Sequence, residues 1–309
     1  MKRFLIHTLA FLTIVLLSCL YVFMQADGHT DAFYVKFTTP KQQSLIVGSS
    51  RAAQGLQPQY IDSLLGDSSL YNYAFSRVHT PYGAPYLESI KKKLDTTSAN
   101  GVFILEVNPW TVCNKIKDKT TTTEFWEESS FLGTVEQVTI HPNFYYLLNF
   151  YDGRNVEILT KKGGNFYGED LYVHDNGWYQ VRLVDNESRK QKRIKSSLNS
   201  YKRIKEEYVG LSKARMEYLR KTIEYLQNFG TVYLVRLPIQ EEMLMIEDDL
   251  LPNFDTVIET LSNKMDILYI NGTKQNLDYD YIDGHHLDIA SGKAYSIVLA
   301  NEIKKHNKR

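Results

Sequence analysis

The longest hydrophobic run in the chain lies at its N-terminus. Residues 4–24 are almost wholly apolar and include no Asp, Glu, Lys or Arg. A helix of this length would extend about 31 Å, which matches a hydrocarbon core about 30 Å thick. Two basic residues precede the run while Asp27 and Asp31 follow it, and basic residues stay on the cytoplasmic side. We therefore expect residues 1–25 to be a single-pass transmembrane signal anchor in the cytoplasmic membrane, with the remainder on the periplasmic or extracellular side.

Two kinds of processing compete with an uncleaved anchor. Leu16-Leu17-Ser18-Cys19 loosely resembles a bacterial lipobox, but the apolar run continues for five residues past the cysteine. A cleaved signal peptide needs a small-x-small site, and none stands out before Ala26. The continuous run therefore favours the uncleaved anchor. Cys113 is the only other cysteine, so we expect no intramolecular disulfide.

Beyond the anchor, short apolar runs alternate with segments of helical pattern. The runs predict five strands, over residues 44–47, 70–73, 102–107, 232–237 and 266–270. The helical segments are residues 59–65, 85–94, 197–228 and 289–304. Strands that alternate with helices form a mostly parallel sheet with helices on both faces. The expected fold class is therefore α/β, a three-layer α/β/α flavodoxin-like sheet.

Two regions depart from this alternation. Residues 26–43 have the character of a polar linker followed by a strand that leads into the main domain at 44–309. Residues from about 111 to 196 are irregular and rich in aromatic side chains, with both helical and β-like stretches. We expect this second region to be an irregular α+β insertion in the sheet domain.

Composition narrows the range of partners. The chain has 309 residues with 36 basic and 36 acidic side chains, so its formal net charge is zero. Because nucleic-acid binding needs a basic surface, no nucleic acid is expected as a partner. The basic run 189–193 is typical of a solvated helix face or loop. The tryptophans Trp110, Trp126 and Trp178 suit either core packing or stacking on sugars.

Polar residues follow three of the predicted strands. In a parallel α/β sheet, ligands bind beyond the carboxyl ends of the strands, so these residues should share one edge. They are Ser49-Ser50-Arg51 after the first strand, Asn108 after the third, and the loop 277–286 after the fifth. The loop contains a carboxylate a few residues before two histidines, a spacing that lets an aspartate orient a histidine toward a serine. By spacing alone, either His285 or His286 could be the base.

These segments resemble blocks of the SGNH (GDSL-like) hydrolases. Gly48-Ser49-Ser50 follows a strand as the family's Gly-Asp-Ser block does, with Ser49 in place of the aspartate. Asp283-Gly284-His285-His286 matches the family's C-terminal Asp-x-x-His block. The resemblance covers roughly residues 44–110 and 230–300. It implies that Ser50 is the nucleophile, His286 the base and Asp283 the carboxylate that orients it.

The middle blocks of the family match only in part. Asn108, in Glu106-Val107-Asn108-Pro109, holds the register of the asparagine in the family's oxyanion hole. Residues 72–77 resemble the second block, with Arg77 where the family has glycine. The resemblance implies an oxyanion hole formed by the Ser50 amide, the Asn108 side chain and the Arg77 backbone N–H. A turn asparagine before proline is the alternative role for Asn108.

The resemblance implies a serine esterase or O-acyltransferase that acts on an acylated cell-envelope glycan or another ester, without a metal or organic cofactor. The anchor and the Gly-Ser-Ser start are loosely similar to the anchored protein of teichoic-acid D-alanylation and to alginate-type acetyltransferases. This likeness adds an envelope acylation machinery to the expected partners. Arg51 and Arg236 are candidates for binding an anionic group of the substrate, and a solvated or structural role is the alternative for each.

Two other hypotheses stay open. The first is a non-catalytic envelope protein that uses the same cleft to bind a glycan or a partner in acylation or export. The missing aspartate and glycine of the family blocks favour it. The second is a metal-dependent hydrolase, whose ligands would be Asp278, Asp283, His285 and His286.

Overall fold

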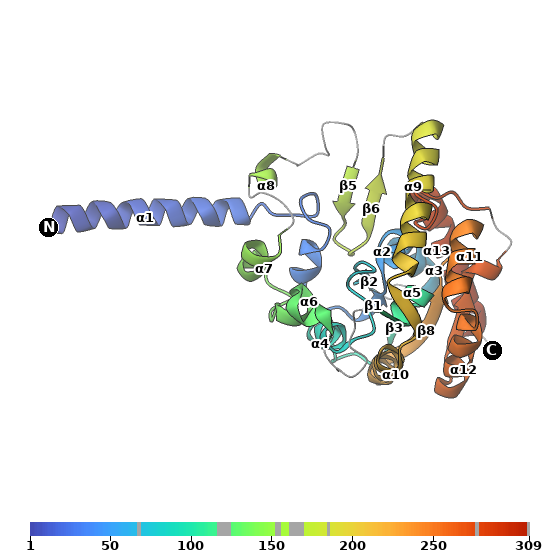
Figure 1. Ribbon diagram of the computed structural model, residues 1–309. Helices are drawn as coiled ribbons and strands as arrows, with labels where there is room; N and C mark the ends of the chain where they lie inside the picture. Colours follow the sequence, from blue (N-terminus) through green and yellow to red (C-terminus); the bar gives the residue numbers. More distant parts are fainter. Residues whose placement is uncertain are drawn as a thin grey trace.

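The structure, a computed structural model, describes residues 1–66, 69–115, 125–151, 156–160, 170–183, 186–275 and 278–307. Figure 1 shows an α/β domain from which one long N-terminal helix projects. This helix, α1 (Lys2–Phe23), has a mean hydropathy of 2.3 over its most apolar window, and none of its residues is buried. It is long and apolar enough to cross a membrane, as the sequence pattern predicts.

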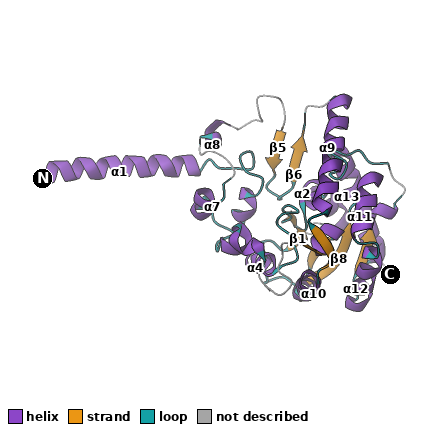
Figure 2. Ribbon diagram, in the orientation of Figure 1, coloured by secondary structure: helices purple, strands orange, loops and turns teal. Residues whose placement is uncertain are grey.

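A five-stranded parallel sheet forms the centre of the domain (Figure 2). Its strands lie in the order β2 (Leu70–Asn72), β1 (Ser44–Val47), β3 (Gly101–Glu106), β8 (Gly230–Arg236) and β9 (Leu268–Asn271), and all four pairings are parallel. Counted along the chain, this is the order 2-1-3-4-5, as in flavodoxin. The five predicted strands are therefore confirmed, with small differences at their ends.

Alternate residues of each strand point to opposite faces of the sheet and meet two helical layers. Leu45, Phe103 and Leu234 belong to one hydrophobic cluster, and Ile46 and Ile104 belong to another. The first cluster includes residues of α4 (Ala84–Lys93), α10 (Lys213–Gln227) and α12 (Phe254–Met265). The second includes residues of α2 (Ser50–Gly55), α3 (Pro58–Leu65) and α13 (Ile289–His306). The three-layer α/β/α class predicted from the sequence is confirmed.

The single helix predicted over residues 197–228 is wrong. Two helices, α9 (Glu187–Lys205) and α10, occupy this region, and β7 (Tyr208–Leu211) separates them. β7 pairs antiparallel with β4 (Cys113–Lys115). Gly210 adopts a positive φ of 48°, which is unfavourable inside a helix of L-residues. Ser212 then caps the new helix, because its side chain accepts a hydrogen bond from the Arg215 N–H at 3.2 Å.

The segment expected to be a linker and a leading strand folds differently. Its regular element is the 3₁₀ helix η1 (Tyr34–Phe37), all of whose residues are buried. The Asp31 carboxylate accepts hydrogen bonds from the Phe33 and Tyr34 N–H groups at 2.8 and 2.7 Å. Such a local side-chain bond favours a turn over an extended strand. The chain therefore passes almost directly from α1 into the packed domain.

The region between β3 and α9 contains short elements, as expected for an irregular α+β insertion. Besides β4, its described elements are α5 (Pro109–Val112), η2 (Trp126–Ser129), α6 (Phe131–Thr134), α7 (Phe144–Asn149), α8 (Glu157–Thr160), β5 (Asp170–Val173) and β6 (Tyr179–Arg182). Phe131 and Tyr146 stack around Phe37 of η1 at ring-centroid distances of 5.3 and 5.2 Å. The remaining elements are α11 (Glu241–Leu250) and η3 (Gly272–Lys274).

Candidate active site

The first element of the site is the turn that follows β1. Gly48 leaves the strand where a Cβ atom would lie 2.7 Å from the Cβ atoms of both Ala52 and Glu106, so this position requires glycine. Ser49 then caps α2 by accepting a hydrogen bond from the Arg51 N–H at 3.3 Å. Ser50 is thus the first residue of α2, at the carboxyl end of a central strand. β1 and β3 are the strands at the topological switch point, where ligands bind in this class of sheet.

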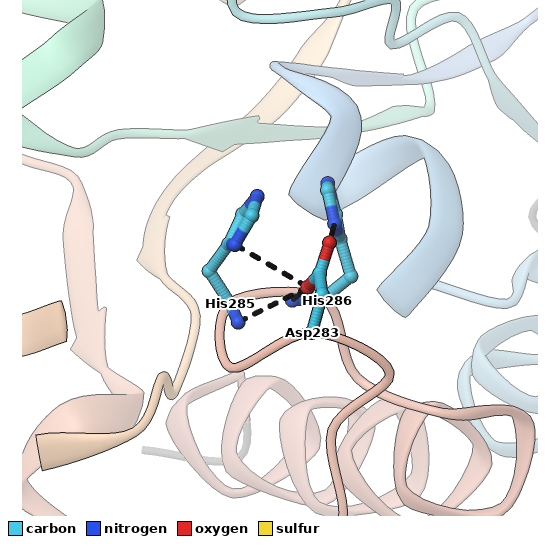
Figure 3. A group of neighbouring side chains, drawn as sticks. All are labelled: Asp283, His285 and His286. Atoms are coloured by element: carbon cyan, nitrogen blue, oxygen red, sulfur yellow. Dashed lines mark hydrogen bonds and ion pairs between the residues drawn. The ribbon is translucent and has the colours of Figure 1, made fainter. Parts of the chain in front are cut away.

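The second element is the loop between β9 and α13, drawn in Figure 3. Asp283 Oδ1 accepts hydrogen bonds from the backbone N–H of His285 at 3.3 Å and of His286 at 3.0 Å. Gly284, between them, has a φ of 96° that L side chains rarely adopt. This compact turn directs the other carboxylate oxygen toward the ring of His286.

The two elements meet in a Ser–His–Asp arrangement. The His286 Nε2 atom lies 2.8 Å from Ser50 Oγ, and the His286 Nδ1 atom lies 2.9 Å from Asp283 Oδ2. Because a carboxylate accepts and does not donate, we assign the ring proton to Nδ1, which leaves Nε2 to accept the serine proton. The structure therefore brings together the three residues predicted as nucleophile, base and orienting carboxylate, in that geometry.

The two adjacent histidines have different surroundings. Burial raises the pKa of Asp283, but the charge and hydrogen bond of His286 outweigh it and hold that pKa below its ordinary range. Burial and the neighbouring His286 lower the pKa of His285 well below its ordinary value, so His285 stays neutral. The ring of His285 packs against Tyr201 at a centroid distance of 4.7 Å. Of the two histidines left open by spacing alone, His286 is the one that contacts Ser50.

A buried carboxylate that the sequence reasoning missed connects the serine turn with Asn108. Glu106, the last residue of β3, is fully buried. One of its oxygens accepts the Ser49 N–H at 2.7 Å and the other accepts the side-chain amide of Asn108. Burial raises the pKa of Glu106, and the Arg51 charge opposes that effect. Ser49 has no carboxylate of its own, but its backbone N–H bonds to the carboxylate of Glu106 on the neighbouring strand β3.

Asn108 has two roles in this geometry. Its carbonyl oxygen accepts the Thr111 N–H at 3.2 Å and caps α5, as the alternative interpretation expected. Its amide group carries two N–H donors, one of which bonds to Glu106. The Asn108 amide and the Ser50 N–H, which as a helix N-terminal group has no intrahelical acceptor, therefore lie at the ends of adjacent strands. The use of Asn108 as an oxyanion donor stays a prediction.

Asn72, at the end of β2, supports the serine-bearing helix. It is fully buried, and its amide donates to the carbonyl groups of Ala52 at 2.8 Å and Leu56 at 2.9 Å. The Ala52 carbonyl also accepts the Leu56 N–H at 3.1 Å, and Leu56 is the C-cap residue of α2, so the Asn72 amide ties the end of this helix to β2. Asn72 belongs to the second block of the family resemblance, but sequence gave no reason to assign it this supporting role.

The two arginines expected to bind substrate lie in the protein interior. Arg51 is 3% exposed and Arg236 is 2% exposed. Both guanidinium groups pair with Glu247 of α11, which is fully buried and also accepts the indole N–H of Trp110 at 2.7 Å. These arginines therefore neutralise a buried carboxylate and are not on a substrate-binding surface. The residues around the two arginines do not predict this pairing, because Glu247 lies on α11, far from Arg51 in the sequence.

Arg77 and two of the three tryptophans contact other parts of the protein, and the third tryptophan is exposed. The Arg77 side chain donates to the Tyr208 hydroxyl at 3.0 Å, and the role of its backbone N–H in the oxyanion hole stays a prediction. Trp110 and Trp178 are buried, so they pack in the core, whereas Trp126 is 37% exposed. Trp126 is thus the one of the three that keeps a surface for stacking.

The basic run 189–193 lies on α9, and two of its members hold the histidine loop. Lys190 Nζ donates to Asp280 at 2.8 Å, and Arg193 Nε donates to the Ile282 carbonyl at 2.8 Å. The other members are exposed, as expected for a solvated helix face. Helix α9 therefore holds the loop that carries His286.

The same loop contains a group of potential metal ligands. Ligand atoms of Asp283, His285 and His286 lie within 4.8 Å of one another, the one such group among the described residues (Figure 3). Asp278, the fourth member of the metal hypothesis, does not belong to it. Both ring nitrogens of His286 already bond to Ser50 and Asp283. A metal here would have to replace one of those bonds.

Comparisons with known proteins add no family to this picture. No protein-family model matches the chain, and a search of curated proteins finds no match. Its chemistry is therefore argued from the geometry of the site.

Proposed function

We propose that the protein is a serine esterase or O-acyltransferase of the SGNH hydrolase type. The observation that carries this proposal is the pair of hydrogen bonds that link Ser50 to His286 at 2.8 Å and His286 to Asp283 at 2.9 Å. A serine needs an adjacent base to act as a nucleophile, and the base needs a third group to fix its tautomer. Both requirements are met by residues that belong to the first and last family blocks.

The reaction follows from these positions. Ser50 Oγ attacks the ester carbonyl while His286 Nε2 takes its proton, and Asp283 stabilises the imidazolium that forms. The oxyanion is held by the Ser50 N–H and the second N–H of the Asn108 amide. His286 then protonates the departing alkoxide, which leaves an acyl group on Ser50. Water or a sugar hydroxyl, deprotonated by His286, attacks this acyl group and releases an acid or a new ester.

The location of the substrate follows from α1. Its length and hydropathy favour a membrane-spanning anchor, and the two basic residues before it favour an outward-facing domain. We propose a single pass through the cytoplasmic membrane, with the site on the periplasmic or extracellular side. The substrate class is then an acylated envelope glycan, and an envelope acylation machinery is the proposed partner.

Labelling with a fluorophosphonate probe tests the catalytic proposal. The full chain, purified in detergent, should be labelled, and Ser50→Ala and His286→Ala should abolish labelling. Ser76→Ala is the matched control, because Ser76 Oγ also bonds to a histidine at 2.8 Å but lies outside the triad. This variant should be labelled at the wild-type rate, and a chelator should change nothing.

The other outcomes separate the remaining hypotheses. A folded wild-type protein that is not labelled would favour the non-catalytic binding role. Hydrolysis of a chromogenic acetyl ester that is lost with chelator and restored by Zn²⁺ would favour the metal hypothesis. If the ester is cleaved, adding a soluble oligosaccharide acceptor distinguishes transfer, which yields acetylated sugar, from hydrolysis, which yields acetate alone.

A further inference from the structure

A group of exposed apolar side chains surrounds the end of α1. Of the twelve large hydrophobic residues after residue 24 that are exposed in the described part of the chain, half lie between residues 140 and 159. Their exposed fractions range from 46% to 69%. We call these six the apolar collar: Ile140, Phe144, Tyr145, Leu148, Val156 and Leu159. Such clustering is unusual, since exposed hydrophobic residues of soluble proteins are normally scattered.

The collar is continuous with α1. The ring of Phe23, the last residue of α1, meets Phe144 edge to face at a centroid distance of 5.8 Å. The His141 ring lies 3.3 Å from the Met24 carbonyl oxygen, and α8 packs directly against α1. Figure 1 shows α7 and α8 on either side of the point where α1 enters the domain. The collar therefore extends the exposed apolar surface of α1 onto the domain itself.

The sequence around the collar has the composition of a membrane interface. Residues 137–151 contain no Asp, Glu, Lys or Arg, although such residues make up 23% of the chain. The segment carries tyrosines and phenylalanines in their place. Tyrosine, like tryptophan, is concentrated where a protein crosses from hydrocarbon to lipid headgroups. Phe144 and Leu148 are four residues apart on α7, so they project from one face of that helix.

No flexible segment separates the anchor from the domain. Ala26 is already buried, and Asp31 accepts a hydrogen bond from the Tyr146 hydroxyl of α7 at 2.9 Å. The position of α1 therefore also fixes the position of α7. If α1 spans a bilayer, the collar lies at the level where the span ends.

We infer that the apolar collar lies in the interfacial region of the lipid leaflet into which α1 emerges. This inference rests on the membrane location in the proposed function. Partial insertion of an apolar face into the headgroup boundary would replace water around these side chains with lipid. It would also hold the domain in one orientation.

Fluorescence quenching by spin-labelled lipid tests the inference in the full chain. Leu148→Cys and Met245→Cys are made in a Cys19→Ser background, where the remaining Cys113 is 3% exposed. Met245, on α11, is the matched control because it is 65% exposed, close to the 69% of Leu148. Each cysteine is labelled with the environment-sensitive dye NBD. The protein is then reconstituted into phosphatidylcholine vesicles with and without lipid that carries a nitroxide near the headgroup.

The dye at position 148 should be quenched at least threefold more than the dye at position 245, and its emission should shift to the blue. The wild-type chain labelled at Cys19, within α1, reports separately on the anchor. Quenching at Cys19 with none at position 148 would overturn the collar while leaving the membrane location intact. Quenching at neither position would show that α1 does not insert, and the collar inference would fall with it. Equal quenching at 148 and 245 would also overturn it.

Discussion

Two serine–histidine pairs lie in this protein with the same spacing but different surroundings. Ser50 Oγ lies 2.8 Å from a nitrogen of His286, and Ser76 Oγ lies 2.8 Å from a nitrogen of His79. The ring of His286 bonds on its other side to the Asp283 carboxylate. The ring of His79 instead packs against Phe131 at a centroid distance of 4.3 Å, and also meets Phe33 and Trp126.

The surroundings give the two histidines different chemical capacities. Burial among aromatic rings, with the nearby Lys115 charge, lowers the pKa of His79 to about 4. A base of such low pKa takes a serine proton poorly at neutral pH. Asp283 provides His286 with a negative charge where an imidazolium would form. We therefore predict that a serine near a histidine is not enough for a nucleophile, and that the carboxylate makes Ser50 the more reactive of the two serines.

Replacing the third group should have the largest effect. Asp283→Asn removes the negative charge and allows the amide to donate to Nδ1, which would leave the proton of His286 on the nitrogen that faces Ser50. We expect the rate of probe labelling to fall by about 10³–10⁴-fold, as for an orienting aspartate in a serine triad. The second-order rate constant of labelling, measured for wild type and variant at neutral pH, checks this.

The outcome bears directly on the comparison between the pairs. Asp283→Asn would make the Ser50–His286 pair resemble Ser76–His79, which has no such carboxylate among its described contacts. A variant that labels at more than a tenth of the wild-type rate would mean that the carboxylate does not distinguish the two pairs. His79→Gln, made in parallel, should leave the labelling rate unchanged.

The second expected effect is on stability. Glu247→Ala removes the carboxylate that pairs with Arg51, next to Ser50, and with Arg236. Breaking a buried ion pair by deleting one partner costs about 3–5 kcal/mol. Arg236 keeps Asp255 at 2.9 Å, so a value near the lower end is expected. Chemical denaturation of the detergent-solubilised chain, followed by tryptophan fluorescence, measures the free energy of unfolding.

A control on the same helix makes this result specific. Asp249 is 70% exposed and pairs with Lys205 at the surface. Exposed ion pairs contribute about 0–1 kcal/mol, so Asp249→Ala should change the free energy of unfolding by no more than that. Equal losses for the two variants would contradict a special role for Glu247 in holding the serine helix.

The sheet and the Ser50–His286–Asp283 arrangement were predictable because their signals are local. Val47-Gly48 ends a strand within two residues, and Asp283 reaches His286 through a turn of four residues. The order of these blocks along the chain then places them at one sheet edge. The five parallel strands were predictable for the same reason, because each is a short apolar run bounded by polar residues.

The buried contacts that hold the site in place were not predictable, because they join residues that are far apart in the sequence. Glu247 contacts Arg51 across a sequence separation of 196 residues. Its spacing from Met243 and Leu250 places it on the buried face of α11, but that spacing does not identify its partner. Glu106 looked like an ordinary strand residue although it bonds to Ser49 and Asn108. Charged residues are almost never fully buried unless paired, and the sequence does not show which carboxylate would pair with Arg51 and Arg236. The break between α9 and α10 did have a local signal. Gly210, with its positive φ, is followed two residues later by Ser212, which caps α10.

A second effect on stability concerns His79 and the pH dependence of unfolding. Its folded pKa of about 4 lies below the ordinary value of 6.5, so between these values the unfolded chain binds more protons than the folded one. The stability that neutral His79 contributes is therefore complete above pH 6.5 and is lost as the pH falls toward 4. At about 1.4 kcal/mol per pKa unit, the loss attributable to His79 approaches about 3 kcal/mol.

His79→Gln removes this titration while keeping a side chain that can bond to Ser76. The free energy of unfolding, measured by denaturation at several pH values from 7 to 4, should fall less steeply in the variant than in the wild type. The difference should appear between about pH 6.5 and 4 and should have vanished at pH 7 apart from a constant offset. Parallel curves for the two proteins would mean that folding does not change the pKa of His79. A lowered pKa of His79 would then not explain why it differs from His286, which bonds to Asp283.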